Sequence, residues 1–154
     1  MLFTQQLARH FRELYFGVNW TSSDLKSILA DITWQEATTK IHELNTILAL
    51  TYHIHYFVRA VVAVLEGKPL DAHDKYSFDH PSIQSEEDWI SFTDMLWSEA
   101  EKFIALIEQL PEHQLEDIFA QEKYGTYYRN IQGVIEHGHY HLGQIVVIKK
   151  ILKT

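Results

Sequence analysis

The segment EHGHYHLGQI, near the end of the chain, holds three histidines within five residues. An α-helix turns about 100° per residue, so side chains four positions apart share a face and side chains two apart diverge. His137 and His141 therefore share a face with the apolar Val134 and Ile145, and we expect this face to point into the protein. His139 is expected to point to solvent. Two inward imidazoles at this spacing are the arrangement from which helical metal sites take two ligands.

A third candidate ligand lies upstream, in the segment LTYHIHYFV. On a helical wheel His53 shares its side with Leu50 and Phe57, whereas His55 falls on the opposite side and is expected to face outward. An ionisable ring in an apolar stripe costs free energy unless it is hydrogen-bonded or bound to a metal. Facing helices of a bundle would bring His53 to the downstream pair, because such sites are built in bundle cores. The residues alone leave two interpretations open, a three-histidine metal site or core histidines satisfied by hydrogen bonds.

Two further positions of the last helical segment bear on this site. Gly138 stands where an H-E-x-x-H zinc protease has its catalytic glutamate, so that class of enzyme has little support. Gln144 shares the face of the candidate ligands one turn along. We expect it either to hydrogen-bond a ligand or substrate, or to serve in packing.

Aromatic and basic residues are mixed in two other segments, KYSFD and EKYGTYYRN. Lys75, Lys123 and Arg129 in these segments could line the mouth of a pocket for an anionic molecule. Packing of the rings, or a contact between subunits, is the alternative interpretation.

Apolar residues at helical spacing mark four main segments, and most of the chain's glycines and prolines stand between them. We expect helices over about 3–15, 45–66, 85–110 and 126–152. The segment 70–84 is expected to be a loop, and 111–125 a connection with at most one helical turn. No convincing alternating strand pattern occurs. The sequence therefore predicts one all-α domain over 1–154, an up-down four-helix bundle whose long connections indicate at least one crossover.

The composition of the chain limits which classes of partner and which reactions are to be expected. The net charge is −8 and no run of basic residues occurs, which argues against nucleic acid as a partner. The longest apolar stretch is interrupted by Arg59 and looks too short to span a membrane, and the N-terminus lacks the pattern of a signal peptide. We therefore expect a cytoplasmic protein with no membrane partner. The chain has no cysteine, so any thiol chemistry needs a thiol from outside.

The run H-x-x-x-H-x-G-Q-I, the histidine of LTYHIHYF and the four-helix layout together resemble the DinB/YfiT-like family. The resemblance covers essentially the whole chain. It implies an up-down-down-up four-helix bundle, a homodimer, and one divalent metal ion on three histidines. Carried over to this sequence, the ligands are His53, His137 and His141, with zinc and nickel as the first candidates for the metal.

The resemblance also implies a class of reaction. Characterised members include S-transferases that use low-molecular-weight thiols and a mycothiol-dependent maleylpyruvate isomerase. The first hypothesis is a metal-dependent thiol S-transferase or a related thiol-dependent enzyme, in which the metal activates an external thiol against an electrophilic substrate and the loops at 70–84 and 119–127 select the partners. A hydrolase using metal-bound hydroxide is the second hypothesis, and it is disfavoured because no inward carboxylate is evident as a base. The third is a metal-binding or structural dimer without turnover.

Overall fold

The computed structural model describes the whole chain, Met1–Thr154, and its regular structure is entirely helical. The four long helices are α1 (Phe3–Phe16), α4 (Ile47–Leu65), α5 (Glu86–Gln109) and α6 (Tyr127–Leu152). Two short helices and three 3₁₀ turns complete the structure: α2 (Leu25–Leu29), α3 (Trp34–Thr38), η1 (Asp74–Tyr76), η2 (Glu112–Glu116) and η3 (Glu122–Tyr124). The predicted all-α class is confirmed. The connection 111–125 holds two 3₁₀ turns, so the expectation of at most one helical turn there is wrong.

Side-chain caps fix where the long helices begin and end. The hydroxyls of Thr46, Ser85 and Thr126 each accept a hydrogen bond from a backbone N–H in the first turn of α4, α5 and α6 respectively. Each cap pairs a donor that the helix itself leaves without a partner. Gly67 follows α4 with φ of 79°, a left-handed conformation that suits glycine after a helix C-terminus.

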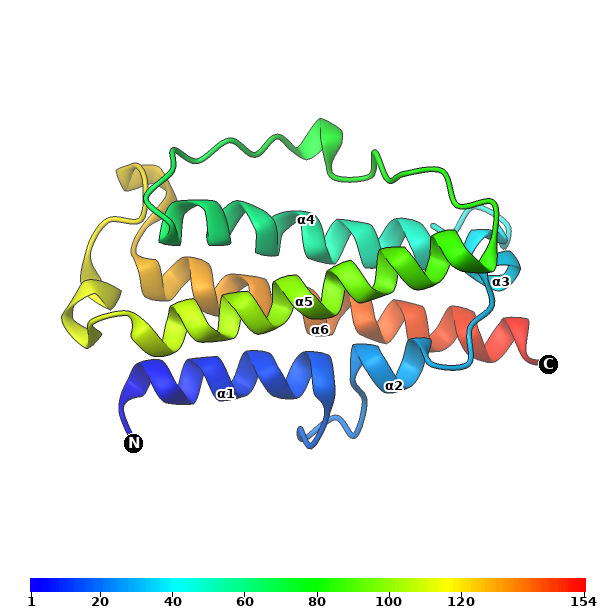
Figure 1. Ribbon diagram of the computed structural model, residues 1–154, viewed down its shortest axis with the longest axis horizontal. Coiled ribbons are helices and arrows are strands. Elements are labelled where there is room, and N and C mark those ends of the chain that lie inside the picture. The colour runs from blue at the N-terminus through cyan, green and yellow to red at the C-terminus, as the bar shows by residue number, and fades with distance from the viewer.

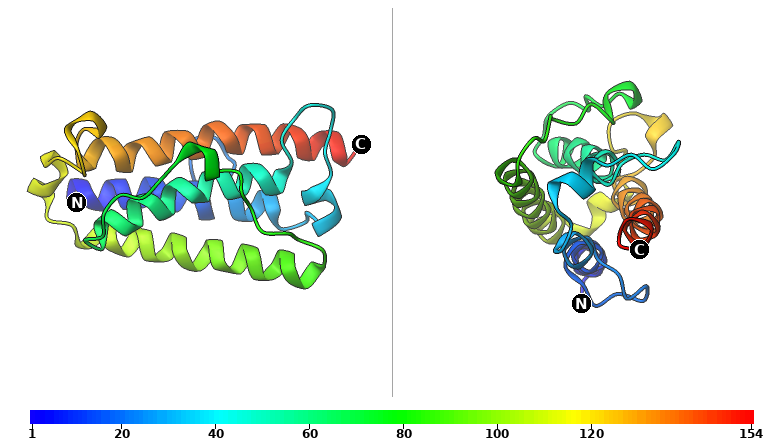
Figure 2. Two further views of the ribbon diagram at one scale, coloured as in Figure 1. Left: turned by 90° about the horizontal axis from the view of Figure 1, so that it is seen from above. Right: turned by 90° about the vertical axis from the view of Figure 1, so that its right-hand side faces the viewer.

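The four long helices lie side by side, with α1 and α6 running in one direction and α4 and α5 in the other (Figure 1). Seen end-on they form a ring in the order α1, α5, α4, α6, and each helix contacts its two neighbours in that ring (Figure 2). Because α4 and α5 run in the same direction, the chain between them returns along the length of the bundle. This crossover, residues 66–85, passes along the outside of α4 (Figure 1).

The buried apolar side chains form one connected core to which all four long helices contribute. Phe11 of α1 and Phe103 of α5 are fully buried and meet edge to face, with ring centroids 4.5 Å apart. Burial of a side chain of this size stabilises the folded state by roughly 1.5–3 kcal/mol. Helix α6 joins the core through residues such as Ile131 and Ile145, and this contact fixes which face of α6 is turned toward α4.

Helix α4 is long and apolar enough to cross a membrane by length and composition, so the expectation that no segment reaches that length is wrong. Its mean hydropathy is 1.5 over the relevant window. In the structure 61% of that window is buried inside the bundle, and the core helix of a bundle has the same composition as a membrane span. Length and hydropathy are therefore weak support for a membrane partner.

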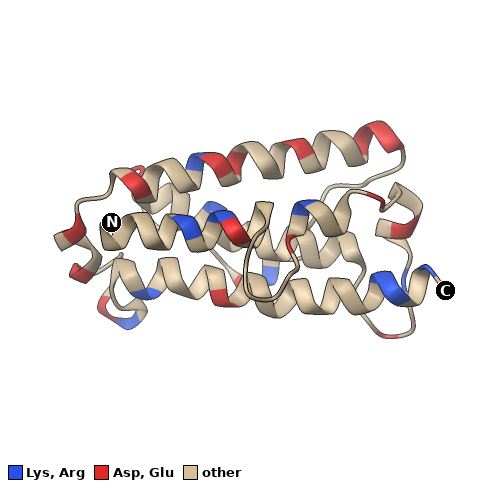
Figure 3. Cartoon of the chain, turned by 90° about the horizontal axis from the view of Figure 1, so that it is seen from below, with Lys and Arg blue, Asp and Glu red and all other residues tan.

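Positions of basic and of acidic residues are spread over the helices and the connections between them, as the view from below shows (Figure 3). Of the 13 Lys and Arg residues, those paired with a carboxylate are Arg9, Arg12, Arg59, Lys68, Lys102, Lys149 and Lys153. Exposed pairs of this kind contribute only about 0–1 kcal/mol each. These ion pairs are more informative in another respect, because they show which Lys and Arg residues have no carboxylate partner.

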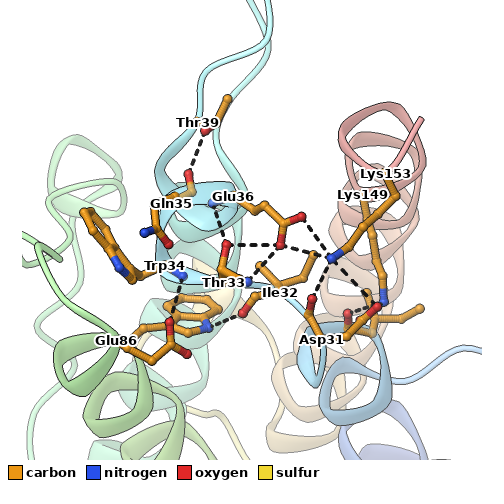
Figure 4. Close-up of polar contacts among 12 residues, drawn as sticks. Asp31, Ile32, Thr33, Trp34, Gln35, Glu36, Thr39, Glu86, Lys149 and Lys153 are labelled. Carbon is orange, nitrogen blue, oxygen red and sulfur yellow. Dashed lines mark hydrogen bonds and ion pairs between the residues drawn. The ribbon is translucent and has the colours of Figure 1, made fainter.

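Lys149 and Lys153 tie the end of α6 to α2, to α3 and to the segment between them (Figure 4). Lys149 donates to the carbonyl of Ile28 at 2.8 Å and to the carboxylate of Asp31. Lys153 donates to the backbone carbonyl of Asp31 at 2.7 Å and lies 2.9 Å from the carboxylate of Glu36. The hydrogen bond from Lys149 lowers the pKa of the Asp31 carboxyl. The last turns of α6, which follow the histidine segment, are thereby held to the rest of the fold.

Candidate metal centre

The three predicted metal ligands come together between α4 and α6. His53 projects from α4, His137 and His141 project from α6, and one ring nitrogen of each lies within 4.8 Å of the others. The Nε2 atoms of His53 and His137 are 3.0 Å apart. The three ring centroids are 4.5 to 4.8 Å apart, and all three rings are partly buried. This cluster could hold a metal ion.

The crossover orients the ring of His53. Its Nδ1–H donates to the hydroxyl oxygen of the buried Ser77 at 3.0 Å, and that hydroxyl donates its own hydrogen to the backbone carbonyl of Asp74 at 2.7 Å. Because the Ser77 hydrogen is already used, Ser77 accepts from His53, and the neutral ring carries its proton on Nδ1. The lone pair of His53 Nε2 therefore faces the other two histidines. Phe78 stacks on the ring, with centroids 4.1 Å apart and planes 6° apart.

Gln144 orients the ring of His141 in the same way. The Nδ1–H of His141 donates to Gln144 Oε1 at 2.6 Å, which leaves Nε2 with a free lone pair. Hydrogen bonds of this kind to the second ring nitrogen fix the tautomer and the orientation of metal-binding histidines. Gln144 is solvent-exposed, so its contact with His141, rather than core packing, is what the structure shows for this residue.

His137 is the most perturbed of the three. Burial, followed by the neighbouring rings of His141 and His53, lowers the pKa of His137 to about 4. Burial also lowers the pKa of His53, with a smaller contribution from His141. Both rings are therefore neutral near pH 7, which is the form that binds metals. The Nε2 atom of His137 faces Nε2 of His53 and is the nitrogen that would bind a divalent ion, whereas its Nδ1 atom is buried without a hydrogen-bond partner.

His55 is buried, so the prediction that it faces outward is wrong. It is only 2% exposed and lies on the side of α4 that faces α1 and α5. The reason is that α4 is apolar on both sides, and neighbouring elements cover both. The fully buried stripe of Thr51, Ile54 and Val58 includes His55, whereas Phe57 beside His53 is only partly buried. A helical wheel built on the His53 side identified one covered face and overlooked the other.

The buried ring of His55 is satisfied by a polar network that sequence reasoning missed. Its Nε2 lies 2.5 Å from a carboxylate oxygen of Glu99, and its Nδ1 lies 3.2 Å from the hydroxyl of Tyr15. A carboxylate can only accept, so Nε2 carries the proton and Tyr15 donates to Nδ1. Arg59 completes the network at 3.2 Å from Glu99. Burial lowers the pKa of His55 and raises the pKa of Tyr15, so both groups stay neutral.

His139 also differs from the expectation that it points to solvent. It is partly buried, and burial followed by the charge of His10 lowers its pKa. It does not belong to the three-histidine cluster. The neighbouring Tyr140 is 66% exposed and contacts the ring of His141 edge to face, with centroids 4.8 Å apart.

The glycine between the two α6 ligands has a structural reason. A Cβ atom added at Gly138 would lie 2.4 Å from the Cδ2 atom of Leu14, which is fully buried in α1. Helix α1 therefore approaches α6 so closely that a side chain at this position would force Leu14 to shift. The larger glutamate of an H-E-x-x-H site would require a greater rearrangement of this contact.

A cavity of about 790 Å³ opens beside the cluster, and His137 forms part of its wall. Its apolar lining includes Phe57, Val61, Phe119 and Val134. The crossover and the connection after α5 also contribute to the wall, so the two loops expected to select partners do border the cavity. Its charged lining consists of Asp74, Lys75, Lys123 and Arg129, together with the titratable His73 and His137.

No family model, no curated protein and no solved structure matches this chain. The class that fold and site define is therefore an all-α protein of four long packed helices with a possible three-histidine metal site. Any closer assignment rests on the residues and their geometry.

Proposed function

We propose that this protein is a DinB/YfiT-like, cytoplasmic metal-dependent thiol S-transferase. In this proposal the Nε2 atoms of His53, His137 and His141 bind one divalent ion, with zinc or nickel as the first candidates. The observation that carries the proposal is the convergence of three imidazole rings, two of which, those of His53 and His141, have their outer nitrogens held by Ser77 and Gln144. The opposed directions of α1 and α6 against α4 and α5 support the up-down-down-up bundle of that family.

Three neutral ligands leave a divalent ion with its full charge and an open position, where it would lower the pKa of a thiol. The chain's own residues would do the remaining work. Ser77 and Gln144 hold the ligand tautomers, and the rings of Phe57 and Phe78 pack against His53 and limit the access of water. The cavity beside His137 would hold the reacting molecules. Because the chain has no cysteine, the nucleophilic thiol would come from outside.

A hydrolase is the second candidate, and one observation favours it more than the sequence did. Asp74 lines the cavity next to His137, so a carboxylate is present that could act as a general base toward a water molecule. Glu99 cannot take that role, because it is engaged by His55 on the opposite side of α4. Because Asp74 could serve as this base, hydrolysis is tested alongside thiol transfer.

The deciding experiment is a turnover assay with zinc- or nickel-loaded protein, a panel of low-molecular-weight thiols, and 1-chloro-2,4-dinitrobenzene. In the expected reaction sulfur bonds to the ring carbon, chloride leaves, and the thiol proton goes to solvent. We expect thiol-dependent turnover that is lost in His53→Ala and kept in His139→Ala. Equal turnover in His53→Ala would contradict the proposal. Hydrolysis of p-nitrophenyl acetate without thiol would favour the hydrolase, and inactivity of metal-loaded protein in both assays would favour a non-catalytic metal-binding dimer.

We also propose a homodimer formed through α6. Large apolar side chains of this helix stay exposed on one side: Tyr140 at 66%, Val147 at 55% and Ile151 at 47%. Spacings of seven and four residues place them along one helix face, where a second copy could cover them. Light scattering should give twice the chain mass of 18.1 kDa, and Val147→Glu should convert the protein to monomer. A monomeric wild-type protein would contradict this assignment.

A further inference from the structure

Three cations without a carboxylate partner gather in the wall of one cavity. The Lys and Arg residues that have no carboxylate partner are Lys26, Lys40, Lys75, Lys123, Arg129 and Lys150. Half of them, Lys75, Lys123 and Arg129, line the cavity beside His137. Asp74 is the one carboxylate in that wall, so the wall carries an excess of positive charge in a protein whose net charge is −8. Such local excess favours an anionic ligand.

Aromatic rings position two of these cations at the mouth of the cavity. The Nζ atom of Lys75 lies 4.5 Å from the ring centroid of Tyr76, and that of Lys123 lies 4.7 Å from the ring centroid of Tyr124. Contacts of this kind hold an ammonium group while leaving its N–H donors free for a ligand. The two lysines come from the crossover and from η3, so the mouth is built from both loops.

Arg129 brings a third cation closer to the histidines. Arg129, Gly133 and His137 are spaced four residues apart on α6, so successive members lie about 6 Å apart along the helix axis. A Cβ atom at Gly133 would lie 3.4 Å from Arg129 Nη1, which shows that the guanidinium lies beside Gly133, one turn before His137. The guanidinium and the His137 ring are therefore about one helical turn apart, which is roughly the length of a small organic acid.

The remaining residues of the cavity wall indicate the chemical character of the ligand's body. Phe57, Val61, Phe119 and Val134 supply an apolar lining to the same cavity that the three cations and His137 border. A cavity of about 790 Å³ lies within the usual range of small-molecule sites, roughly 300–1,000 Å³. An apolar body with one anionic end fits this arrangement better than a sugar or a nucleotide, which would expose many polar groups to the apolar lining.

We propose that this cavity binds a small organic anion with an apolar body, whose carboxylate or sulfonate contacts Arg129 and Lys123. Its opposite end then points to the histidine cluster. A reaction of this end at the histidine cluster rests on the proposed function, and it would make small organic anions the substrate class of that metal site. Binding of the anion itself needs no metal, so the two proposals can fail separately.

The test measures binding of two fluorescent probes to metal-free protein. One is 8-anilinonaphthalene-1-sulfonate, and the other is N-phenyl-1-naphthylamine, its analogue without the sulfonate. In Lys123→Gln/Arg129→Gln the Kd of the sulfonate is expected to rise about tenfold or more, since two charge-assisted hydrogen bonds are lost. The Kd of the neutral analogue should stay within about twofold. The control Lys40→Gln/Lys150→Gln removes the same charge elsewhere and should leave both values unchanged.

A second variant locates the probes. Gly133→Leu fills the cavity from α6 and replaces a helical glycine by a better helix former, so the fold should persist. Both probes should then lose most of their affinity. Unchanged sulfonate binding in either cavity variant, or an equal loss in the control, would overturn the proposal. A protein that binds no metal yet shows the expected probe pattern would refute the proposed function and leave the anion site standing.

Discussion

The close approach of α1 to α6 predicts opposite effects for one substitution at two glycines. A Cβ atom at Gly138 would lie 2.4 Å from the fully buried Leu14, whereas one at Gly143 would have nothing within 4 Å. Overpacking a core costs about 1–3 kcal/mol. Replacing a helical glycine by alanine gains about 1 kcal/mol at either position. Gly143→Ala should therefore stabilise the protein, and Gly138→Ala should be about 1–3 kcal/mol less stable than Gly143→Ala.

Urea unfolding of the metal-free protein, followed by far-UV circular dichroism, measures this difference. Metal-free conditions are needed because an ion bound only to the folded state adds stability by mass action. The midpoint for Gly143→Ala should lie above that of the wild type, and the midpoint for Gly138→Ala clearly below that of Gly143→Ala, with similar slopes. Equal stabilisation by both substitutions would refute the tight packing of α1 against α6 between the two candidate ligands.

Three further predictions concern the polar partners of the histidines. Tyr15→Phe should lower the free energy of unfolding by about 1–3 kcal/mol in urea titrations, because the buried Nδ1 of His55 loses its donor. The stability of the metal-free protein should fall as pH drops below about 6.5, because burial lowers the pKa of His55 and the unfolded chain takes up the proton first. His55 contributes at most about 1.4 kcal/mol per pH unit to that slope, and His53, His137 and His139, whose pKa values burial also lowers, add to it. His55→Gln, which keeps a donor and an acceptor, should therefore reduce the slope. Ser77→Ala should weaken metal binding about 10–100-fold in calorimetric titrations without changing helix content, because His53 loses the partner that fixes its tautomer.

The sequence predicted the parts of the structure that depend on local signals. Ser85 and Thr126 mark the starts of α5 and α6 because their hydroxyls accept hydrogen bonds from backbone N–H groups of the first turn. Gly67 marks the end of α4 because it adopts the left-handed conformation that terminates a helix. The pairing of His137 and His141 was predictable because residues four positions apart share one face of a helix.

The partners of the histidines could not be predicted in the same way. Ser77 lies in a crossover without periodicity, and its contact with His53 depends on how that loop folds back over α4. The burial of His55 depends on Glu99 and Tyr15, which lie 44 and 40 positions away in the sequence. Because α4 is apolar on both sides, its pattern alone does not say which side carries a metal ligand and which a hydrogen-bonded core histidine.

Metal binding to the purified protein and its histidine variants tests the central claim most directly. Elemental analysis and calorimetric titration with Zn²⁺ and Ni²⁺ should find about one ion per chain in the wild type and in His139→Ala, as a single tetrahedral-type site requires. His53→Ala, His137→Ala and His141→Ala should each lose metal, with affinity reduced by more than about 100-fold, beyond the usual effect of an outer-shell substitution. Metal content in His137→Ala equal to that of the wild type would contradict the assignment of the site.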